Sequence, residues 1–311
     1  MTPIRLLLLY DVQGWACHAN CLALAKHVEL NAPGQFRITL APGNQVSASQ
    51  LADFDVVLST IYYGLTHAAH PRSISMISSY SYWIRKGWTA EQNTETGVAG
   101  WPHLRAWKYM VAHNKDIFER LLSEDHPRIC LLYHLFDHDL WTPSQEPKVP
   151  TRDLVVGFAG HRQPLKGLHL LEEAVAGLPG MVLRTPTYEI GRLPYTQMPD
   201  FYRSLDTYVC MSAPGQDAGP RSPIEAGLCG VPVVTTQVGQ IGEMITHEVN
   251  GLIVARTVTS LRENLCRLRD NPTLRTRLAG NIRESFLRPW TIQVGRAWTD
   301  FLLRVAREGK P

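Results

Sequence analysis

The segment from residue 207 to residue 236 constrains the fold of this chain more than any other. It reads as an apolar strand pattern at 207–211, a polar loop rich in glycine and proline, a short helix pattern at 223–229, a turn at Gly230 and a second strand pattern at 232–236. A strand, a helix and a strand in this order form a unit whose two strands run parallel, and a parallel sheet needs helices on its faces. The polar loop follows the first strand, and such folds bind ligands beyond the carboxyl ends of their strands.

Two acidic residues flank the start of the helix in this segment. Asp217 lies in the loop, and Glu225 lies on the helix eight positions further along. Backbone N–H groups at the first turn of a helix attract an anion, and ionised carboxylates accept hydrogen bonds from hydroxyl groups. The segment therefore predicts a nucleotide-sugar site, with a phosphate on the amides and sugar hydroxyls on the carboxylates.

The alternation of strands and helices occurs twice along the chain. Strand patterns occupy residues 4–10, 36–40, 55–60, 73–78 and 128–133 in the first half, and 154–159, 181–185, 207–211 and 232–236 in the second. Apolar residues at helical spacing are found at 15–28, 101–122, 168–176, 261–270, 272–284 and 289–307. We predict an α/β protein of two Rossmann-like, doubly wound domains that face each other across a cleft.

A proline-rich stretch separates the two series. Residues 142–150 hold three prolines and no apolar periodicity, which is typical of a linker. We therefore place an N-terminal domain at residues 1–145, a linker at 146–150 and a C-terminal domain at 151–288, followed by a helix at 289–311.

The composition is that of a soluble globular protein. Of the 311 residues, 44% are hydrophobic and 19% are charged. No apolar run approaches the ~20 residues of a membrane span, and the run at 6–10 has no signal-peptide cleavage pattern. The six scattered cysteines suit the reduced thiols of a cytoplasmic protein. The net charge of +3 neither requires nor excludes an anionic partner.

A second polar loop follows the first strand pattern of the C-terminal half. Residues 157–167 contain Gly160, His161, Arg162 and Lys166. Glycine lets the backbone approach a ligand closely, and the basic side chains can neutralise a diphosphate. The residue order differs from that of a Walker A loop, so the loop predicts another kind of phosphate contact.

Six strings in a fixed order resemble one enzyme family. They are residues 160–167, residues 195–213 with Asp206 and Ser212, the pair Asp217 and Glu225 at E-x7-E spacing, residues 225–234 (EAGLCGVPVV), residues 250–254 (NGLIV) and residues 137–143 (DHDLWTP). Together they are similar to the signature of the retaining GT-B glycosyltransferases, the large bacterial family of glycosyl transferases group 1. The resemblance extends from about residue 108 to residue 290.

The resemblance implies an enzyme that moves a sugar from a nucleoside diphosphate sugar, with a UDP-sugar favoured, to an acceptor hydroxyl with retention of configuration. Lys166 and Arg162, with His161, would hold the diphosphate, where negative charge grows as the anomeric C–O bond breaks. Glu225 would accept the ribose hydroxyls, and Asp217 those of the transferred sugar. We expect the donor to contact Gly14, Gly160, His161, Arg162, Gly215, Gln216, Ala218, Gly219, Arg221, Ser222 and Ile224.

The scheme requires neither a metal ion nor a cofactor. Asp137 and Asp139 match the bare Asp-x-Asp string of metal-dependent transferases. They fall at the domain junction, where the family pattern already accounts for Asp137, so we interpret the string as a turn.

Three departures from the family pattern stand out. Asp217 replaces the first glutamate of E-x7-E, and His161 stands where the family usually has arginine. The family's histidine after a first-domain strand has no counterpart behind residues 74–78. We assign that catalytic role to His18, which follows the first strand and loop, with His113 as the alternative. The departures also fit an inactive GT-B-like binding protein. A third alternative is a related GT-B enzyme that isomerises a nucleotide sugar instead of transferring it.

The acceptor should bind to the first domain. Residues 80–88 and 105–109 interleave aromatic and basic side chains, which can stack on rings and reach phosphates. The plain interpretation is a helix with an aromatic core face. Otherwise the segments suit a glycan or lipid-linked acceptor, or DNA with hydroxymethylated bases. In the resembling family the last helix crosses back to the first domain, and peripheral membrane contact is the competing role for its aromatic and basic residues.

Overall fold

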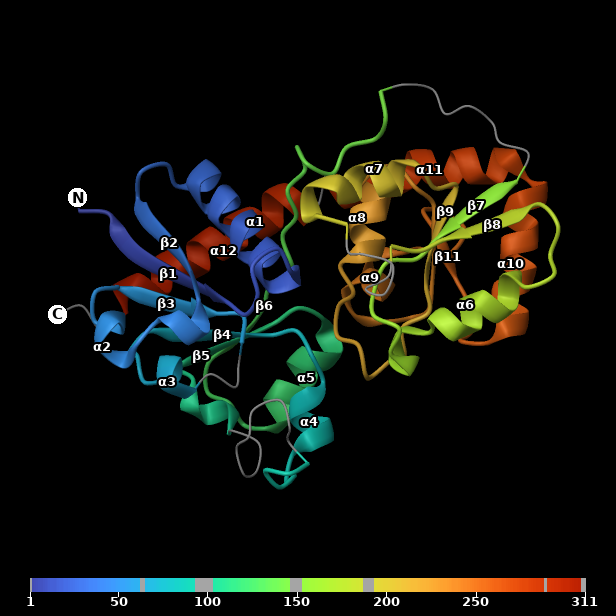
Figure 1. Cartoon of the computed structure of the whole chain (residues 1–311). Coiled ribbons are helices and arrows are strands. Elements are labelled where there is room, and N and C mark those ends of the chain that lie inside the picture. The colour runs from blue at the N-terminus through green and yellow to red at the C-terminus, as the bar shows by residue number, and fades with distance from the viewer. Residues whose placement is uncertain are drawn as a thin grey trace. The chain divides into compact units, whose positions relative to one another are not determined.

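The computed structural model describes residues 2–61, 65–92, 103–145, 153–186, 193–287 and 290–308. The chain forms two compact units (Figure 1). Unit 1 comprises Met1–Phe136 and Trp290–Pro311, and unit 2 comprises Asp137–Pro289. The proposed linker, residues 146–150, lies outside the described residues.

Unit 1 is built on a six-stranded parallel sheet in the order β2-β1-β3-β4-β5-β6. The central strands are almost entirely apolar because helices cover both faces. Leu6 to Leu9 are at most 1% exposed. The strands are β1 (Ile4–Tyr10), β2 (Phe36–Pro42), β3 (Val56–Ser59), β4 (Ser73–Ile77), β5 (Tyr109–Ala112) and β6 (Ile129–Leu131).

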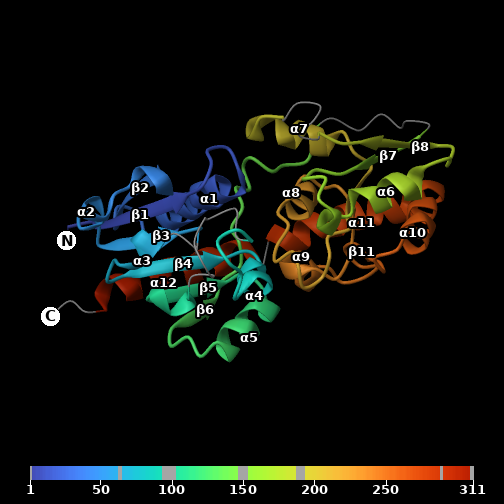
Figure 2. The ribbon, with the colours of Figure 1, turned by 60° about the horizontal axis from the view of Figure 1, so that its bottom comes forward.

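Two helices from opposite ends of the chain pack together on this sheet. α1 (Ala16–Asn31) lies along α12 (Trp290–Arg307), and Figure 2 shows them from a second direction. Trp298, Phe301 and Leu302 of α12 are at most 4% exposed in the core that α1 and the sheet share. The smaller helices of unit 1 are α2 (Ala48–Leu51), α3 (Leu65–Ala68), α4 (Ser81–Arg85) and α5 (Lys115–Ser123).

Unit 2 contains a five-stranded parallel sheet in the order β11-β10-β9-β7-β8. Its strands are β7 (Leu154–Gly157), β8 (Met181–Arg184), β9 (Thr207–Cys210), β10 (Val233–Thr235) and β11 (Leu252–Ile253). The helices are α6 (Leu168–Val175), α7 (Met198–Arg203), α8 (Ser222–Leu228), α9 (Gly239–Met244), α10 (Val258–Asp270) and α11 (Pro272–Leu287). The two units together confirm the predicted doubly wound α/β class.

One predicted helix is wrong. Residues 101–122 have helical spacing, but the described part contains a 3₁₀ turn (Leu104–Ala106), β5 and then α5. The residues of β5 are all buried, so this run is a central strand rather than one stripe of a helix. α5 begins only after Asn114, whose side chain accepts a hydrogen bond from the N–H of Ile117 and caps the helix.

The division between the units falls at Asp137, before the proline-rich stretch. Trp141 is fully buried in unit 2, where its ring contacts the rings of Tyr195 and Tyr202. Arg203 donates hydrogen bonds to the carbonyl and hydroxyl oxygens of Thr142 at 2.8 and 2.9 Å. These contacts bind residues 137–143 to unit 2.

Candidate functional site

The strand order of unit 2 gives a topological switch point between β7 and β9. From β7 the chain moves to β8 on one side, then returns across β7 to β9 on the other side. Loops leaving two such strands turn in opposite directions, and open α/β sheets bind ligands at this topological switch point. The two loops there are residues 158–167 after β7 and residues 211–221 after β9. These are the two polar loops that the sequence analysis selected.

Short contacts fix the two loops against each other. The Tyr208 hydroxyl donates to the carbonyl of Ala159 at 3.0 Å and accepts from its N–H at 3.1 Å. The Ala213 N–H donates to the carbonyl of Leu165 at 2.8 Å. Gly167 has φ +74°, and a Cβ there would lie 2.4 Å from the backbone oxygen of Met211, so only glycine fits this crossing.

Arg256 clamps the same pair of loops from the β11 side. Its guanidinium donates to the carbonyl of Met211 at 2.9 Å and to that of Pro164 at 2.6 Å. Arg256 follows β11 and is separated in sequence from Met211 by 45 residues and from Pro164 by 92. The loops are therefore held as one surface.

Lys166 and Asp217 form an ion pair on this surface. Lys166 ends the 3₁₀ helix Pro164–Lys166, and Asp217 lies in the loop after β9. The Lys166 Nζ lies 2.5 Å from Oδ2 of Asp217. The two side chains are 24% and 10% exposed, so solvent screens their attraction only in part. The structure thus brings together two residues that sequence reasoning assigned to catalysis.

Glu225 is buried on α8 within a polar network. Its Oε1 accepts a hydrogen bond from the Nε of Arg221 at 3.2 Å, and its Oε2 accepts from the Tyr202 hydroxyl at 3.0 Å. Burial raises the pKa of Glu225, while Arg221 and Tyr202 oppose that rise by stabilising the carboxylate. Any ribose hydroxyl at Glu225 would have to share these oxygens with two protein groups.

The remaining residues predicted at the donor differ in accessibility. Gly215 and Gln216 are exposed, and Gly160, His161, Gly219 and Ser222 are half-buried. Arg162 is exposed and forms an ion pair with Glu172 of α6 at 3.1 Å. The side chains of Ala218 and Ile224 are 0% and 1% exposed, so these two could offer a ligand only their backbone.

Unit 1 has a switch point of its own between β1 and β3. Gly14 and His18 lie in the loop and helix that follow β1. The Gly14 N–H donates to Nδ1 of His18 at 3.1 Å, and the His18 ring lies 4.5 Å from that of Tyr10 between centroids. Partial burial lowers the pKa of His18, which favours the neutral ring with its proton on Nε2.

His113, the alternative to His18, is a core residue. It is 0% exposed, its Nδ1 lies 2.7 Å from the carbonyl oxygen of Leu132, and its ring stacks on His134 at 3.7 Å between centroids. Such a position gives the ring no access to a substrate.

Asp137 has the geometry of a turn residue. Its Oδ1 accepts hydrogen bonds from the backbone N–H groups of Asp139 at 3.0 Å and Leu140 at 3.3 Å. Across the described ranges, no group of three or more His, Cys, Asp and Glu side chains is placed to hold a metal ion.

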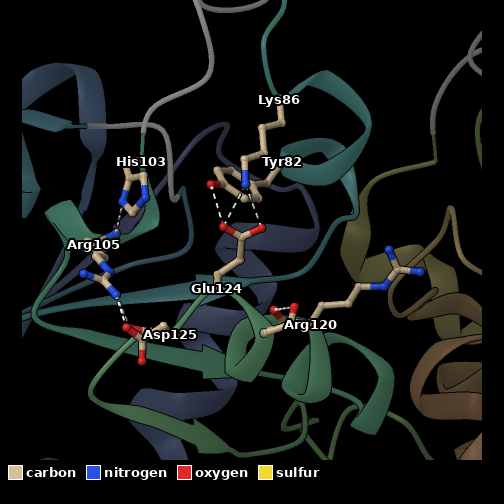
Figure 3. Close-up of polar contacts among 8 residues, drawn as sticks. Tyr82, Lys86, His103, Arg105, Arg120, Glu124 and Asp125 are labelled. Carbon is tan, nitrogen blue, oxygen red and sulfur yellow. Dashed lines mark hydrogen bonds and ion pairs between the residues drawn. The ribbon is translucent and has the colours of Figure 1, made fainter.

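Three cations in or beside the aromatic and basic segments of unit 1 form ion pairs with carboxylates. Lys86 pairs with Glu124 at 2.9 Å, and Arg105 pairs with Asp125 (Figure 3). Arg120 pairs with Asp116 at 3.2 Å. The Arg120 guanidinium also lies 4.9 Å from the ring centre of Tyr80 and 5.7 Å from that of Trp83. Each of these three cations therefore has a carboxylate partner.

The last helix uses its aromatic face inside unit 1. Trp298 donates from Nε1 to the carbonyl of Tyr133 at 2.9 Å and is 1% exposed. A bilayer therefore cannot reach Trp298 or Phe301. In the part of the chain that the structure describes, none of the helices combines the length and hydrophobicity needed to cross a membrane.

Solved structures share this architecture over almost the whole chain. HepE of Anabaena, in complex with UDP and glucose, has a TM-score of 0.71 at 16% identity, and the match covers 97% of this chain and 99% of that one. Sucrose-phosphate synthase of Thermosynechococcus elongatus has a TM-score of 0.71 at 14% identity, with 97% and 98% covered. The fold is that of the GT-B glycosyltransferases.

Sequence comparison also finds similarity to glycosyltransferases, in the second half of the chain. Residues 182–285 match the family model described as glycosyl transferases group 1. Over 64 residues the chain is 45% identical to the lipopolysaccharide core biosynthesis mannosyltransferase LpsB of Rhizobium meliloti (strain 1021), and the aligned part is 20% of this chain and 17% of LpsB. Residues 182–285 are thus similar to the glycosyl transferases group 1, and the aligned part spans less than a fifth of the length of LpsB.

Sequence reasoning missed the residues that hold the site together. Tyr202, Tyr208 and Arg256 make the contacts described above, yet none of them lies in a glycine loop or beside an acidic pair. One signal was available for Tyr208 and Tyr202, since a tyrosine hydroxyl in a buried element needs a hydrogen-bond partner. No local signal marks Arg256, because its partners are distant in sequence.

Proposed function

We propose that this protein transfers a sugar from a UDP-sugar to an acceptor hydroxyl, with retention of configuration and without a metal ion. The ion pair of Lys166 and Asp217 at the β7–β9 switch point is the observation that carries the proposal. HepE, which shares the fold, binds UDP and UDP-glucose, and this supports a UDP-sugar as the donor.

The chemistry follows from the charges in the two loops. The bond between the anomeric carbon and the diphosphate oxygen breaks, a new bond forms to the acceptor oxygen, and the proton of the acceptor hydroxyl passes to the leaving diphosphate oxygen. Lys166 stabilises the negative charge that grows on the diphosphate, so a metal ion is not needed for that task. Arg162 can add a second cation when it leaves Glu172, because that ion pair is exposed and weak.

The acceptor in this proposal is a glycan or a lipid-linked sugar on unit 1. The carboxylate partners of Lys86, Arg105 and Arg120 lower the net positive charge of this surface, which favours a carbohydrate over DNA, since DNA binding depends on cations that replace counterions. His18 would donate a hydrogen bond from Nε2 to an oxygen at the reaction centre. The name of LpsB, a lipopolysaccharide core mannosyltransferase, is consistent with a glycan acceptor.

We place the protein in the cytoplasm. All six cysteines are free thiols, and Cys21, Cys210 and Cys229 are buried. Reduced buried cysteines suit a reducing compartment.

Release of UDP from a panel of UDP-sugars tests the function. We expect wild type to hydrolyse one donor slowly without acceptor, and Lys166→Ala to lose about 10²–10³ of that rate, the cost of a lost charge-stabilising donor. Arg267→Ala is the matched control because it breaks an exposed ion pair of unit 2, with Glu248, outside both loops. Lys166→Ala at the wild-type rate would contradict the assignment, and binding without turnover would indicate an inactive binding protein.

A further inference from the structure

Lys166 and Asp217 bind each other, whereas the proposed function needs them on different parts of the donor. The Asp217 carboxylate is the partner of the Lys166 ammonium in the structure, at 2.5 Å. A diphosphate and this carboxylate are both anions that compete for the same ammonium group. One of the two contacts must therefore give way when a donor binds.

The backbone around the pair is too constrained to make this change. Lys166 is followed by Gly167, which touches the backbone of Met211, and Arg256 ties both loops together. Asp217 is followed by Ala218, whose carbonyl packs closely against the backbone of Gly239: a Cβ on Gly239 would lie 2.3 Å from that oxygen. The flexible side chain of Lys166, with four rotatable methylenes, is the part that can move.

We propose, on the basis of the function above, that Asp217 acts as an internal competitor that holds Lys166 until a nucleoside diphosphate sugar replaces it. The diphosphate draws Lys166 away, and the freed Asp217 carboxylate accepts a hydroxyl of the sugar. No covalent bond changes in this exchange.

The exchange lets the site bind the sugar donor in preference to the product UDP. A UDP-sugar satisfies both partners, since the diphosphate takes Lys166 and the sugar hydroxyl takes Asp217. UDP alone takes Lys166 but leaves the buried Asp217 carboxylate next to the negative charges of the diphosphate, which is unfavourable. Asp217 therefore weakens the binding of UDP relative to the sugar donor, and it recaptures Lys166 once the sugar has left.

Calorimetric titration with UDP and with UDP-glucose tests the exchange. In Asp217→Asn, UDP should bind about 3–10-fold more tightly than in wild type, the range for a weak to moderate ion pair. UDP-glucose should gain less, so the preference for the sugar donor over UDP falls. Asp217→Glu keeps the charge and should restore the wild-type preference. Unchanged or weaker UDP binding in Asp217→Asn, with thermal unfolding like that of wild type, would overturn the proposal.

A double-mutant cycle separates the exchange from simple repulsion. If Asp217 acts by holding Lys166, then Asp217→Asn should tighten UDP binding by less than half as much in the Lys166→Ala background. Tightening of equal size in both backgrounds would mean that Asp217 only repels the diphosphate, and would overturn the exchange. Glu248→Gln, which breaks the exposed pair with Arg267, should leave UDP binding unchanged.

The same titrations distinguish this inference from the proposed function. Loss of UDP affinity in Lys166→Ala, without tightening in Asp217→Asn, would leave the donor site in place and remove the exchange. Equal UDP affinity in wild type and Lys166→Ala, or no UDP binding by wild type, would contradict the donor site, and the exchange with it.

Discussion

Single residues show how burial sets the cost of each charge in unit 2. The pair of Arg221 and Glu225 is 6% and 7% exposed, whereas the pair of Arg267 and Glu248 is 43% and 44% exposed. A buried ion pair whose partner is removed leaves an uncompensated charge, while an exposed pair contributes little. Arg221, the residue before α8, and Glu225 on α8 are four positions apart, and this spacing suggests a contact from sequence alone. The partner Tyr202, from another helix, does not follow from the spacing.

Glu225→Gln should destabilise the protein by about 3–5 kcal/mol, because Arg221 then stays buried without its carboxylate. Urea unfolding at neutral pH measures this. Glu248→Gln, the same chemical change in an exposed pair, should cost less than about 1 kcal/mol. An equal loss of unfolding free energy in the two variants would show that burial of Glu225 does not determine how much its ion pair contributes to stability.

At the scale of helices, arginine side chains in unit 2 donate hydrogen bonds to the last carbonyl groups of α6 and α8. Arg262 donates to the carbonyls of Glu173 and Ala174 at the end of α6, at 2.7 and 3.0 Å. Arg283 of α11 donates to the carbonyl of Leu228 at the end of α8, and to that of Trp141 at 2.8 Å. The last carbonyls of a helix lack partners within it, and these cations supply them. The arginine-rich run of α10 and α11 therefore serves the fold.

Arg283→Ala should cost about 1–3 kcal/mol, because it leaves two buried carbonyls without their donor. Arg277→Ala, which removes one donor from the exposed Glu248 backbone at 3.0 Å, is the control and should cost less than half as much. Chemical denaturation of both variants gives the comparison. A silent Arg283→Ala would refute the capping role.

Two strands of unit 1, β4 and β6, are each preceded by a histidine with the same pair of hydrogen bonds. His70 and His126 each stand in a His-Pro-Arg string, where Nδ1 accepts the N–H of the arginine and Nε2 faces a carbonyl before the neighbouring strand, at 3.1 Å in both cases. The partners are the carbonyls of Phe54 and Trp107. Both rings are buried, which lowers the pKa of each histidine, so the folded protein holds them neutral.

Acid should therefore weaken unit 1. The folded pKa of His70 and His126 is lowered, so the unfolded chain binds the proton first, and stability present above pH ~6.5 is lost as the pH falls through that value. Each ring can add at most about 1.4 kcal/mol per pH unit to the slope. The free energy of unfolding at pH 7.5 and 5.5 should differ less in a His70→Gln, His126→Gln variant than in wild type. An identical pH slope in the two proteins would count against this role of the two histidines.

At the scale of the molecule, unit 1 depends on a segment from the far end of the chain. Residues 290–308 supply Trp298, Phe301 and Leu302 to its core, and the Arg72 side chain donates to the backbone of Glu308 at 2.9 Å. Residues 137–289 need no such segment, because all the strands of their sheet lie within that range. The sequence pattern predicts the apolar face of α12, but it does not predict which surface of the protein that face covers.

Separate expression of the two units tests this dependence. Residues 137–289 should unfold cooperatively on their own, whereas residues 1–136 should fold only when a peptide of residues 290–308 is added, since truncating buried aromatic side chains costs about 3–5 kcal/mol each. Circular dichroism with thermal melting reads the outcome. Cooperative melting of residues 1–136 alone would show that α12 is dispensable.

The sequence was sufficient for the class of fold and for the two loops of unit 2, because glycine turns and apolar strands are local signals. It also assigned both loops to one donor, but it did not give the direct contact between their side chains. Lys166 and Asp217 are 51 residues apart, with β8 and α7 between them, and they meet only because β9 pairs with β7. Strand order depends on the packing of whole elements, which no local pattern records. The helix predicted over β5 was wrong because both faces of this strand are buried, so the alternation of apolar and polar residues that marks a strand is missing.

Hydrogen–deuterium exchange with and without UDP tests the donor site most directly, because it locates binding without assuming which residues bind. The account predicts slower exchange in residues 158–167 and 211–222, the loops beyond β7 and β9, and loss of that protection in Lys166→Ala. Protection confined to other segments, or the same protection in Lys166→Ala, would contradict it.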